Sequence, residues 1–187
     1  MTTPFFFGYG SLVNRRTHVY TDAHPAVLTG WRRCWRHIAA LETAFLTAIP
    51  SERDHIEGLI AAVPGADWAA LDEREVFYQR IDTGGVTHSL TPAPDIQHYH
   101  APLELNPAAP DLRPILLSYL DVVVQGYLAE HGTTGVAKFF DTTDGWDAPV
   151  LDDRHAPRYP RHQVLSMTET LLVDAHLAKV NAQIIRP

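Results

Sequence analysis

Apolar and polar positions in the first half of the chain follow the pattern of short strands. Phe5, Phe6 and Phe7 predict a buried strand, and Gly8-Tyr9-Gly10 after it predicts a tight turn. Mixed apolar and polar runs predict further strands at residues 26–38, with a bulge or bend at Gly30, at 45–49 and 56–63, which the polar run 51–55 separates, and at 86–90 and 96–100.

The second half of the chain carries the stronger helix patterns. Residues 112–131 form the longest predicted helix, because an apolar stripe runs along it and Gly132 follows in the position of a C′ glycine. Further helices are predicted at 134–140 and 168–180. Between them, residues 141–161 are rich in Asp, Pro, Gly and Arg and predict an ordered loop.

The order of these elements indicates the fold class. Strands come first, a helix beginning near residue 67 interrupts them, and helices dominate the second half. This order favours an α+β protein over alternating βαβ units. We therefore predict a small curved β-sheet or barrel flanked by helices, with a helical C-terminal half, in one domain over residues 1–187.

Composition and charge exclude several classes of function. Acidic side chains outnumber basic ones 22 to 15, and the formal charge of −7 argues against a nucleic-acid partner. Arg32, Arg33 and Arg36 form the main basic cluster, and solvated arginines on a two-sided strand explain it at least as well as a ligand site does. No window approaches the roughly 20 apolar residues that span a bilayer, and the first seven residues lack a secretory pattern. We expect a cytoplasmic protein with no membrane partner.

Glu75 is the candidate catalytic residue. Trp68, Leu71, Glu75 and Tyr78 are spaced along one side of a helix, so this carboxylate takes the place of an apolar side chain. A carboxylate in a partly apolar pocket has a raised pKa, which suits a group that accepts and releases a proton near neutrality. On this helix alone, a Glu at the edge of the stripe, paired with Arg80 or solvated, is the simpler interpretation.

The loop Gly8-Tyr9-Gly10-Ser11-Leu12 is the candidate substrate-binding segment. Its glycines allow a tight turn and the close approach of a ligand, and successive N–H groups in such a turn can hold a carboxylate or an oxyanion. A plain turn after a strand is the alternative. The loop is not a nucleotide-binding motif, and Ser11 does not stand in the G-x-S-x-G elbow of a serine hydrolase.

Four motifs occur in order along residues 4–132. The first is Phe7-Gly8-Tyr9-Gly10-Ser11-Leu12, which looks like a YGSL/YGSN signature, and the second is Ile56-Glu57-Gly58-Leu59-Ile60, which looks like a V-x-G strand. The third is Leu71-Asp72-Glu73-Arg74-Glu75 with Tyr78 and Arg80, which looks like an L-D-x-x-E helix and the aromatic and basic pair after it. The fourth runs from Tyr119-Leu120 through Gly126 and looks like a Y-L-x-x-I-x-x-G helix. Together they resemble the γ-glutamylcyclotransferase superfamily, with its ChaC and AIG2-like branches, in a bacterial-type member.

The resemblance implies a γ-glutamylcyclotransferase-like fold and an enzyme that releases 5-oxoproline from a γ-glutamyl amide. The amide would be a γ-glutamyl amino acid, a γ-glutamyl amine or glutathione, whose α-amine attacks its own γ-carbonyl. Glu75 would be the general acid and base, and the substrate would be bound by Tyr9, Gly10, Ser11, Leu12 and Tyr119. The resemblance implies a small-molecule partner and no metal or other cofactor, and it leaves a homodimer open.

The chain departs from the family pattern in two places. Val76 and Phe77 follow Glu75 where many members have glycine, which would alter the pocket wall and hence the substrate. The extension 134–187 lies beyond the motifs, and its acidic clusters could form a lid, although turn caps made by Asx hydrogen bonds are the preferred interpretation. Tyr159 and Arg161 in this extension receive no role.

Other functions fit single features of the sequence. His98 and His100 would point to one face of a strand, as some metal sites require, but no third ligand follows from spacing, and structural or surface histidines are the simpler interpretation. Cys34 is the only cysteine, which excludes an intrachain disulfide and indicates a buried, inert thiol. A hydrolase that uses Ser11 would lack its elbow. A binding protein of the same fold without turnover is the strongest rival, and the carboxylate of Glu75 argues against it.

Overall fold

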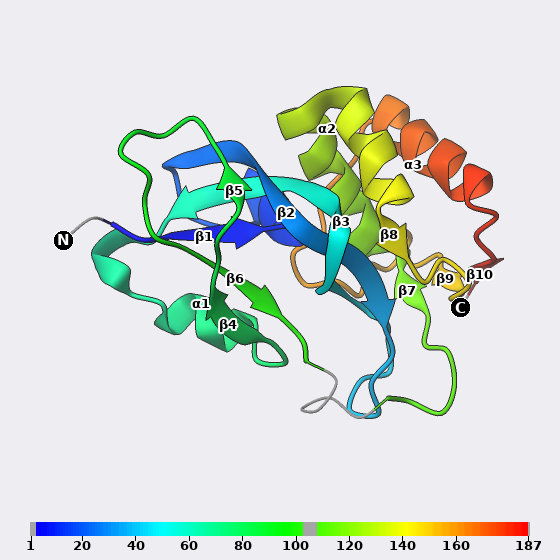
Figure 1. Cartoon of the computed structure of the whole chain (residues 1–187). Helices are drawn as coiled ribbons and strands as arrows, with labels where there is room; N and C mark the ends of the chain where they lie inside the picture. The colour runs from blue at the N-terminus through cyan, green and yellow to red at the C-terminus, as the bar shows by residue number, and fades with distance from the viewer. Residues whose placement is uncertain (1–2, 103–107, 187) are drawn as a thin grey trace.

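A curled sheet forms the centre of the molecule (Figure 1). In residues 3–102 and 108–186, which the computed structural model describes, this sheet has seven strands in the order β4-β6-β1-β3-β2-β5, with β8 paired to β2. The strands are β1 (Phe5–Gly8), β2 (Ala23–Arg36), β3 (Phe45–Ala62), β4 (Gln79–Asp82), β5 (Val86–Thr87), β6 (Ile96–His100) and β8 (Thr143–Asp144).

Strand β1 forms as the sequence predicts, and its end positions the loop that follows. Its phenylalanines are buried, and it runs antiparallel to β3 and parallel to β6. A Cβ at Gly58 on β3 would lie 2.4 Å from the carbonyl oxygen of Gly8, so the close approach of the two strands requires a glycine there. The last residue of β1 is thereby held against β3, and the chain turns directly after it.

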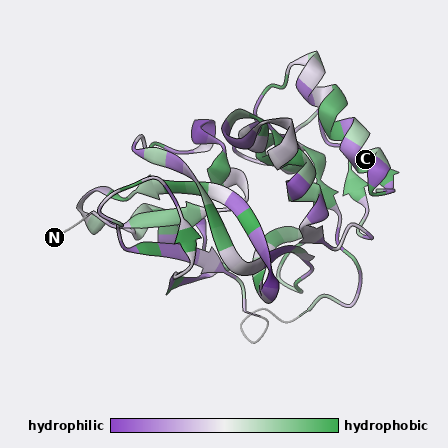
Figure 2. Ribbon diagram, turned by 45° about the horizontal axis from the view of Figure 1, so that its top comes forward, coloured by the Kyte–Doolittle hydropathy of each residue, from purple (hydrophilic) through white to green (hydrophobic). Residues whose placement is uncertain are grey.

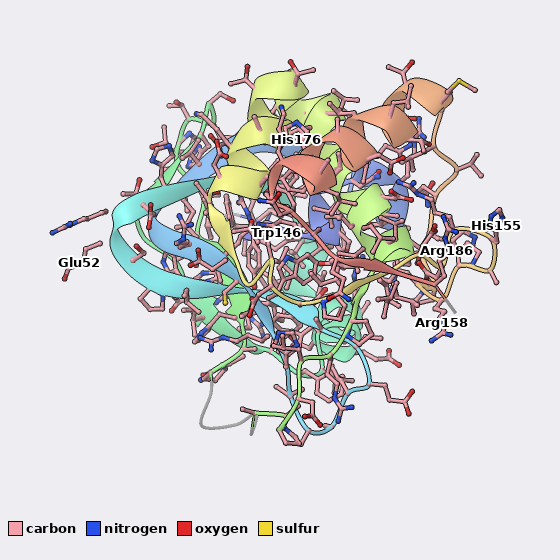
Figure 3. The ribbon with its side chains drawn as sticks, turned by 90° about the vertical axis from the view of Figure 1, so that its right-hand side faces the viewer. Glu52, Trp146, His155, Arg158, His176 and Arg186 are labelled. Carbon is pink, nitrogen blue, oxygen red and sulfur yellow. The ribbon has the colours of Figure 1, made fainter. Side chains whose placement is uncertain are left out.

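A long hairpin of β2 and β3 forms the curved wall of the sheet. The predicted irregularity is confirmed, because the register shifts between Thr29 and Trp31, and Gly30 has a φ of 86°. The predicted break at residues 51–55 is wrong, since β3 is continuous through them. These residues lie where the hairpin extends beyond the core, and Glu52 projects away from the body of the protein (Figure 3). Both faces of the hairpin meet water there, so polar side chains are compatible with a strand.

The remaining predicted strands have different outcomes. The strand predicted at 96–100 is confirmed as β6. The strand predicted at 86–90 is reduced to Val86 and Thr87, because only these two residues pair with β2.

The helices are α1 (Ala69–Arg74), α2 (Leu117–Asp141) and α3 (Met167–Lys179), with 3₁₀ turns η1 (Ser11–Val13), η2 (Arg15–Thr17) and η3 (Pro64–Ala66). Helix α3 confirms the prediction at 168–180 and begins with a capping box of Ser166 and Glu169. Gly132 interrupts α2 with a φ of 65° and a ψ of −169°, so the helices predicted at 112–131 and 134–140 are two parts of one kinked element. That element begins at Leu117, five residues later than predicted.

The prediction of a helical C-terminal half is wrong. Within its described residues the helices are α2 and α3, and the long segment between them, residues 142–166, is not helical. Strands β7 (Ile115–Leu116), β9 (Val150–Leu151) and β10 (Ile184–Ile185) form a small parallel sheet beside α2. A strand of two residues is too short to show a period in the sequence. Each of these strands is held extended by a partner that is distant in the chain. None of the helices in the described part of the chain has the length and apolarity to cross a bilayer.

Hydrophobic positions of the sheet and of the two long helices pack together in one core (Figure 2). At its C-terminal side, the ring of Phe140 stacks with the rings of Trp146 and His176, at centroid distances of 4.9 and 4.8 Å. These contacts join the end of α2 to the following loop and to α3, so the C-terminal elements are fixed against the sheet that carries the candidate site.

The sequence prediction that the basic cluster on β2 is solvated is wrong for Arg33, which is fully buried. Its guanidinium donates to the Tyr127 hydroxyl at 3.1 Å and to the Glu57 carbonyl at 3.2 Å, and lies 4.9 Å from the centre of the Phe139 ring. These contacts replace water around the buried cation. Cys34 is half-buried rather than buried, and burial raises the pKa of its thiol.

The acidic cluster at residues 152–154 joins the C-terminal elements. The buried carboxylate of Asp153 caps the start of α2, because it accepts the Ser118 backbone N–H at 2.8 Å and the Ser118 hydroxyl at 2.6 Å. Arg154 bridges Asp121 on α2 and Asp174 on α3, at 2.8 Å in each case. For this cluster, the interpretation as a structural element rather than a lid is confirmed.

Gly126 provides a test of how α2 packs. A Cβ at this position would lie 2.7 Å from the backbone nitrogen of Asn14 and 2.8 Å from its Cα. Gly126→Ala is therefore expected to destabilise the fold by about 1–3 kcal/mol, because backbone atoms must shift to admit the methyl group. Denaturant unfolding measures this loss. Gly84→Ala is the control, since a Cβ there meets no atom within 4 Å, and an equal effect of the two substitutions would contradict the packing argument.

Candidate active site

A small cavity of about 40 Å³ lies where β1 ends. Every residue that the sequence proposes for the site lines it: Tyr9, Gly10, Ser11, Leu12, Glu75 and Tyr119. The structure therefore brings together residues that are up to 110 positions apart in the chain. Leu46, Tyr78 and Tyr99 complete most of the wall.

The glycine loop owes its shape to two close approaches. A Cβ at Gly8 would lie 2.5 Å from the Cβ of Leu12, and a Cβ at Gly10 would lie 2.6 Å from the hydroxyl oxygen of Tyr119. After Gly10 the chain enters η1, in which the N–H of Val13 already donates to the Gly10 carbonyl at 3.0 Å. The earlier N–H groups of such a turn have no partner within it.

Neutral phenols surround the cavity. The hydroxyl of Tyr9 donates to the Tyr99 carbonyl at 2.6 Å, and the hydroxyl of Tyr78 donates to the Leu46 carbonyl at 2.6 Å. Burial raises the pKa of Tyr9, Tyr78 and Tyr119, and the nearby carboxylate of Glu75 adds to this effect. The three phenols therefore keep their protons across the physiological range and can act only as neutral hydrogen-bonding groups.

Glu75 reaches the cavity from the end of a helix rather than from its side. The predicted helical stripe is wrong beyond Arg74, where α1 ends, and Glu75 caps it by donating its N–H to the Leu71 carbonyl at 2.9 Å. Its carboxylate lies 3.2 Å from the guanidinium of Arg74. Burial raises the pKa of Glu75, while Arg74 and then Arg161 lower it, and burial has the larger effect.

The simpler interpretation of Glu75, a carboxylate that pairs with Arg80 or is solvated, is wrong, because Arg80 pairs elsewhere and the Glu75 side chain is only 16% exposed. The guanidinium of Arg80 pairs with Asp72 at 2.9 Å and lies 4.4 Å from the centre of the Trp68 ring. Arg80 thus braces the outer side of α1 against β4, and Glu75 is left facing the cavity with Arg74 beside it.

Ser11 is engaged by two side chains that the sequence did not assign. Arg74 donates to its hydroxyl oxygen at 3.0 Å, and the hydroxyl of Tyr159 donates to the same oxygen at 2.9 Å. The Tyr159 ring also meets the Tyr119 ring edge-on, with centroids 5.0 Å apart. These contacts join the 142–166 segment to the glycine loop. A serine hydrolase needs a base beside the hydroxyl, and here two donors occupy that place.

His98 and His100 lie on β6 as predicted, but their surroundings are those of a packed cluster. The ring of His98 is buried, its Nδ1 contacts the Thr83 hydroxyl, and Trp31 packs against it with centroids 4.4 Å apart. Burial lowers the pKa of His98 to about 3. In the described part of the chain, no group of three or more His, Cys, Asp or Glu side chains is arranged to hold a metal ion.

The raised pKa of Glu75 has a consequence for stability. The folded protein holds this proton more tightly than the unfolded chain, so its contribution to stability is complete below the ordinary pKa of 4.5 and is lost as pH rises through the folded value. Glu75→Gln removes the titration. We expect the free energy of unfolding of the variant to rise relative to wild type between about pH 4.5 and neutrality, as measured by denaturant unfolding at several pH values. A difference that is constant over this range would contradict the burial of the carboxylate.

Comparison with known proteins gives the fold. No family model matches the sequence, and no curated protein matches it. Among solved structures, a γ-glutamyl cyclotransferase superposes with a TM-score of 0.57 at 14% identity, over 92% of this chain and 99% of its own. The uncharacterized human protein loc79017 gives a TM-score of 0.56 at 14% identity, over 93% of this chain and 99% of its own. The chain has the γ-glutamyl cyclotransferase fold.

A third structure, YkqA from Bacillus subtilis, superposes with a TM-score of 0.55 at 18% identity, over 78% of this chain and 57% of that protein. The likeness confirms the fold that the motifs imply and the predicted α+β architecture with a curled sheet. At these identities the likeness is one of fold, so the roles of Glu75, the glycine loop and Tyr119 stay predictions.

Proposed function

We propose that the protein releases 5-oxoproline from γ-glutamyl amides. The observation that carries this proposal is the half-buried carboxylate of Glu75, which faces the same small cavity as the glycine loop and has a raised pKa. A protein that only binds a γ-glutamyl ligand has no need for a carboxylate at this cost in burial. A group that must take up a proton and return it within one turnover does need one.

The reaction joins and cleaves bonds within one substrate molecule. The α-nitrogen forms a bond to the carbonyl carbon of the γ-amide, the bond from that carbonyl carbon to the leaving nitrogen breaks, and no water or electron transfer is involved. Glu75 removes a proton from the α-ammonium group, which otherwise cannot attack. When the ring closes, the attacking nitrogen loses a second proton and the departing nitrogen gains one through Glu75. The other proton goes to the released amine, which leaves as an ammonium ion. Holding the two ends of the substrate in ring-closing geometry is worth up to roughly 7–11 kcal/mol.

Two negative charges on the substrate need partners: the α-carboxylate and the oxyanion that develops on the γ-carbonyl oxygen. N–H groups at the start of η1 are the proposed donors for the oxyanion that develops on the γ-carbonyl. Arg161 is the proposed partner of the α-carboxylate, because its positive charge acts on Glu75 and lowers the pKa of that carboxyl group. Arg74 has a different role, since it is already bonded to Ser11, to the Thr17 carbonyl at 2.9 Å and to Glu75. We assign it the positioning of the Glu75 carboxylate.

The direct test is product formation. The purified protein is incubated with γ-glutamyl amino acids, γ-glutamyl amines and glutathione, and 5-oxoproline is measured by mass spectrometry. Release of 5-oxoproline together with an equal amount of free amine is the expected result. Binding of these amides without product would instead favour a binding protein of the same fold, and release of glutamate would indicate hydrolysis.

A further inference from the structure

A second cavity lies beside the cavity that contains Glu75. Its volume is about 180 Å³, and it shares Leu46, Tyr78 and Tyr119 with the first cavity. Phe45, Leu116 and Tyr159 form most of its remaining wall. The two cavities are also linked across Ser11, which lines the first one and accepts a hydrogen bond from Tyr159, which lines the second.

The size of the first cavity requires part of any substrate to lie outside it. An apolar cavity of roughly 150 Å³ holds one benzene molecule, whereas the cavity at Glu75 measures about 40 Å³. A γ-glutamyl amide is larger than benzene. Because the γ-glutamyl half must stay beside Glu75 for ring closure, the amine half is the part that extends beyond the shared wall of Tyr78 and Tyr119.

The chemistry of the second cavity restricts what it can hold. None of its lining side chains is charged. A carboxylate placed there would lose water without gaining a cationic partner, which is strongly unfavourable. The wall is instead aromatic: the rings of Tyr119 and Tyr159 meet edge-on, and so do those of Phe45 and Tyr78, with centroids 5.5 Å apart. Such rings offer faces and edges to another apolar or aromatic group.

We propose that this second cavity binds the leaving amine and selects an uncharged apolar or aromatic one, such as a phenethylamine group. The proposal rests on the cyclotransferase function proposed above and names its substrate class. It predicts poor use of glutathione, whose leaving dipeptide carries a carboxylate. The chemical alternative is a leaving group whose carboxylate reaches Arg36 and His37 in the next cavity, which shares Phe45.

The experiment compares substrates that share the γ-glutamyl group and differ only in the leaving amine. The kcat/KM for 5-oxoproline release is measured with γ-glutamyl methylamide, γ-glutamyl phenethylamide, γ-glutamyl-phenylalanine and glutathione. Burial is worth about fourfold for each methylene group, so we expect the phenethylamide to exceed the methylamide by roughly thirtyfold or more. It should also exceed γ-glutamyl-phenylalanine and glutathione by about tenfold, since these place a carboxylate near an apolar wall. Equal values for the two amides, or a preference for either carboxylate-bearing substrate, would overturn the proposal.

A variant tests whether this cavity causes the preference for the phenethylamide. Thr43 lines it, is half-buried and forms part of a loop rather than a strand. Thr43→Phe fills the space, so the ratio of phenethylamide to methylamide should fall about tenfold or more. Thr168→Phe, on the exposed surface of α3, is the matched control and should keep the wild-type ratio. An unchanged ratio in Thr43→Phe would place the amine elsewhere.

Binding measurements separate this inference from the function on which it rests. Calorimetry with Glu75→Gln gives the affinity of the two amides without turnover. If no amide yields 5-oxoproline in wild type, the proposed function fails, and the affinity ratio still tests the cavity. Tighter binding of the phenethylamide, lost in Glu75→Gln combined with Thr43→Phe, supports the aromatic subsite. Equal affinity for both amides rejects it.

Discussion

Glu75→Gln is expected to lower kcat for 5-oxoproline release by about two to four orders of magnitude, the usual contribution of a positioned general acid and base. Gln keeps the size and most of the hydrogen bonds of the side chain but cannot take a proton from the α-ammonium group. Steady-state rates across pH measure this effect. In wild type, kcat/KM should fall on the acid side as Glu75 becomes protonated, at a pH above the ordinary value because burial raises its pKa.

The matched control is Glu73→Gln, which removes an exposed carboxylate from the same helix. It should retain wild-type rates and the wild-type pH profile. Thermal melting of both variants shows whether the fold is intact. Activity of Glu75→Gln within tenfold of wild type, in a folded protein, would remove Glu75 from the role of proton carrier.

The two features that the sequence identified are local ones. The glycine loop can be recognised in the sequence because a buried apolar strand runs directly into the closely spaced Gly8 and Gly10. At both positions a Cβ atom would come too close to a neighbouring side chain. Glu75 is readable because it interrupts an apolar spacing. The reason turned out to be different, since α1 ends at Arg74 and the carboxylate enters the cavity from the C-terminal cap. Spacing thus indicated a residue that lines the cavity, on a helix that is too short to have a stripe.

The residues that complete the site could not be read from the sequence, because distant pairing brings them there. Tyr159 lies in a segment without a period, and its contact with Ser11 spans 148 residues. Arg74 stands next to Glu75 in the sequence, and no local pattern shows that its guanidinium reaches the Ser11 hydroxyl. Leu46 lines the cavity from β3, and nothing in the local pattern of residues 45–49 indicates this contact.

The burial of Arg33 likewise results from contacts with residues that are distant in the chain. A run of arginines beside tryptophans is compatible with a solvated strand face, and the sequence does not show that Tyr127 and Phe139 lie over one of them. The short strands β7, β9 and β10 replace the predicted helical half for a similar reason, because each is fixed by a partner far away in the chain. Local period thus predicted the long elements and the catalytic candidate, while tertiary pairing decided the rest.

Arg161→Ala is expected to raise KM for γ-glutamyl amides by about 10- to 100-fold, the effect of losing one hydrogen-bonded charge pair of roughly 1.5–3 kcal/mol. A smaller change is expected in kcat, because the α-carboxylate takes no part in the bond changes. The variant should also shift the pH profile. Arg161 lowers the pKa of Glu75, so its removal raises that pKa and moves the acid limb of kcat/KM to higher pH.

Arg158→Ala is the matched control for this prediction. Arg158 lies three residues earlier on the same segment, and its exposed side chain points away from the body of the protein (Figure 3). It should leave both KM and the acid limb unchanged. The two readouts distinguish binding from packing, since a merely structural role of Arg161 would lower stability without moving the acid limb. An unchanged KM and an unshifted limb in Arg161→Ala would remove Arg161 from the role of partner of the α-carboxylate.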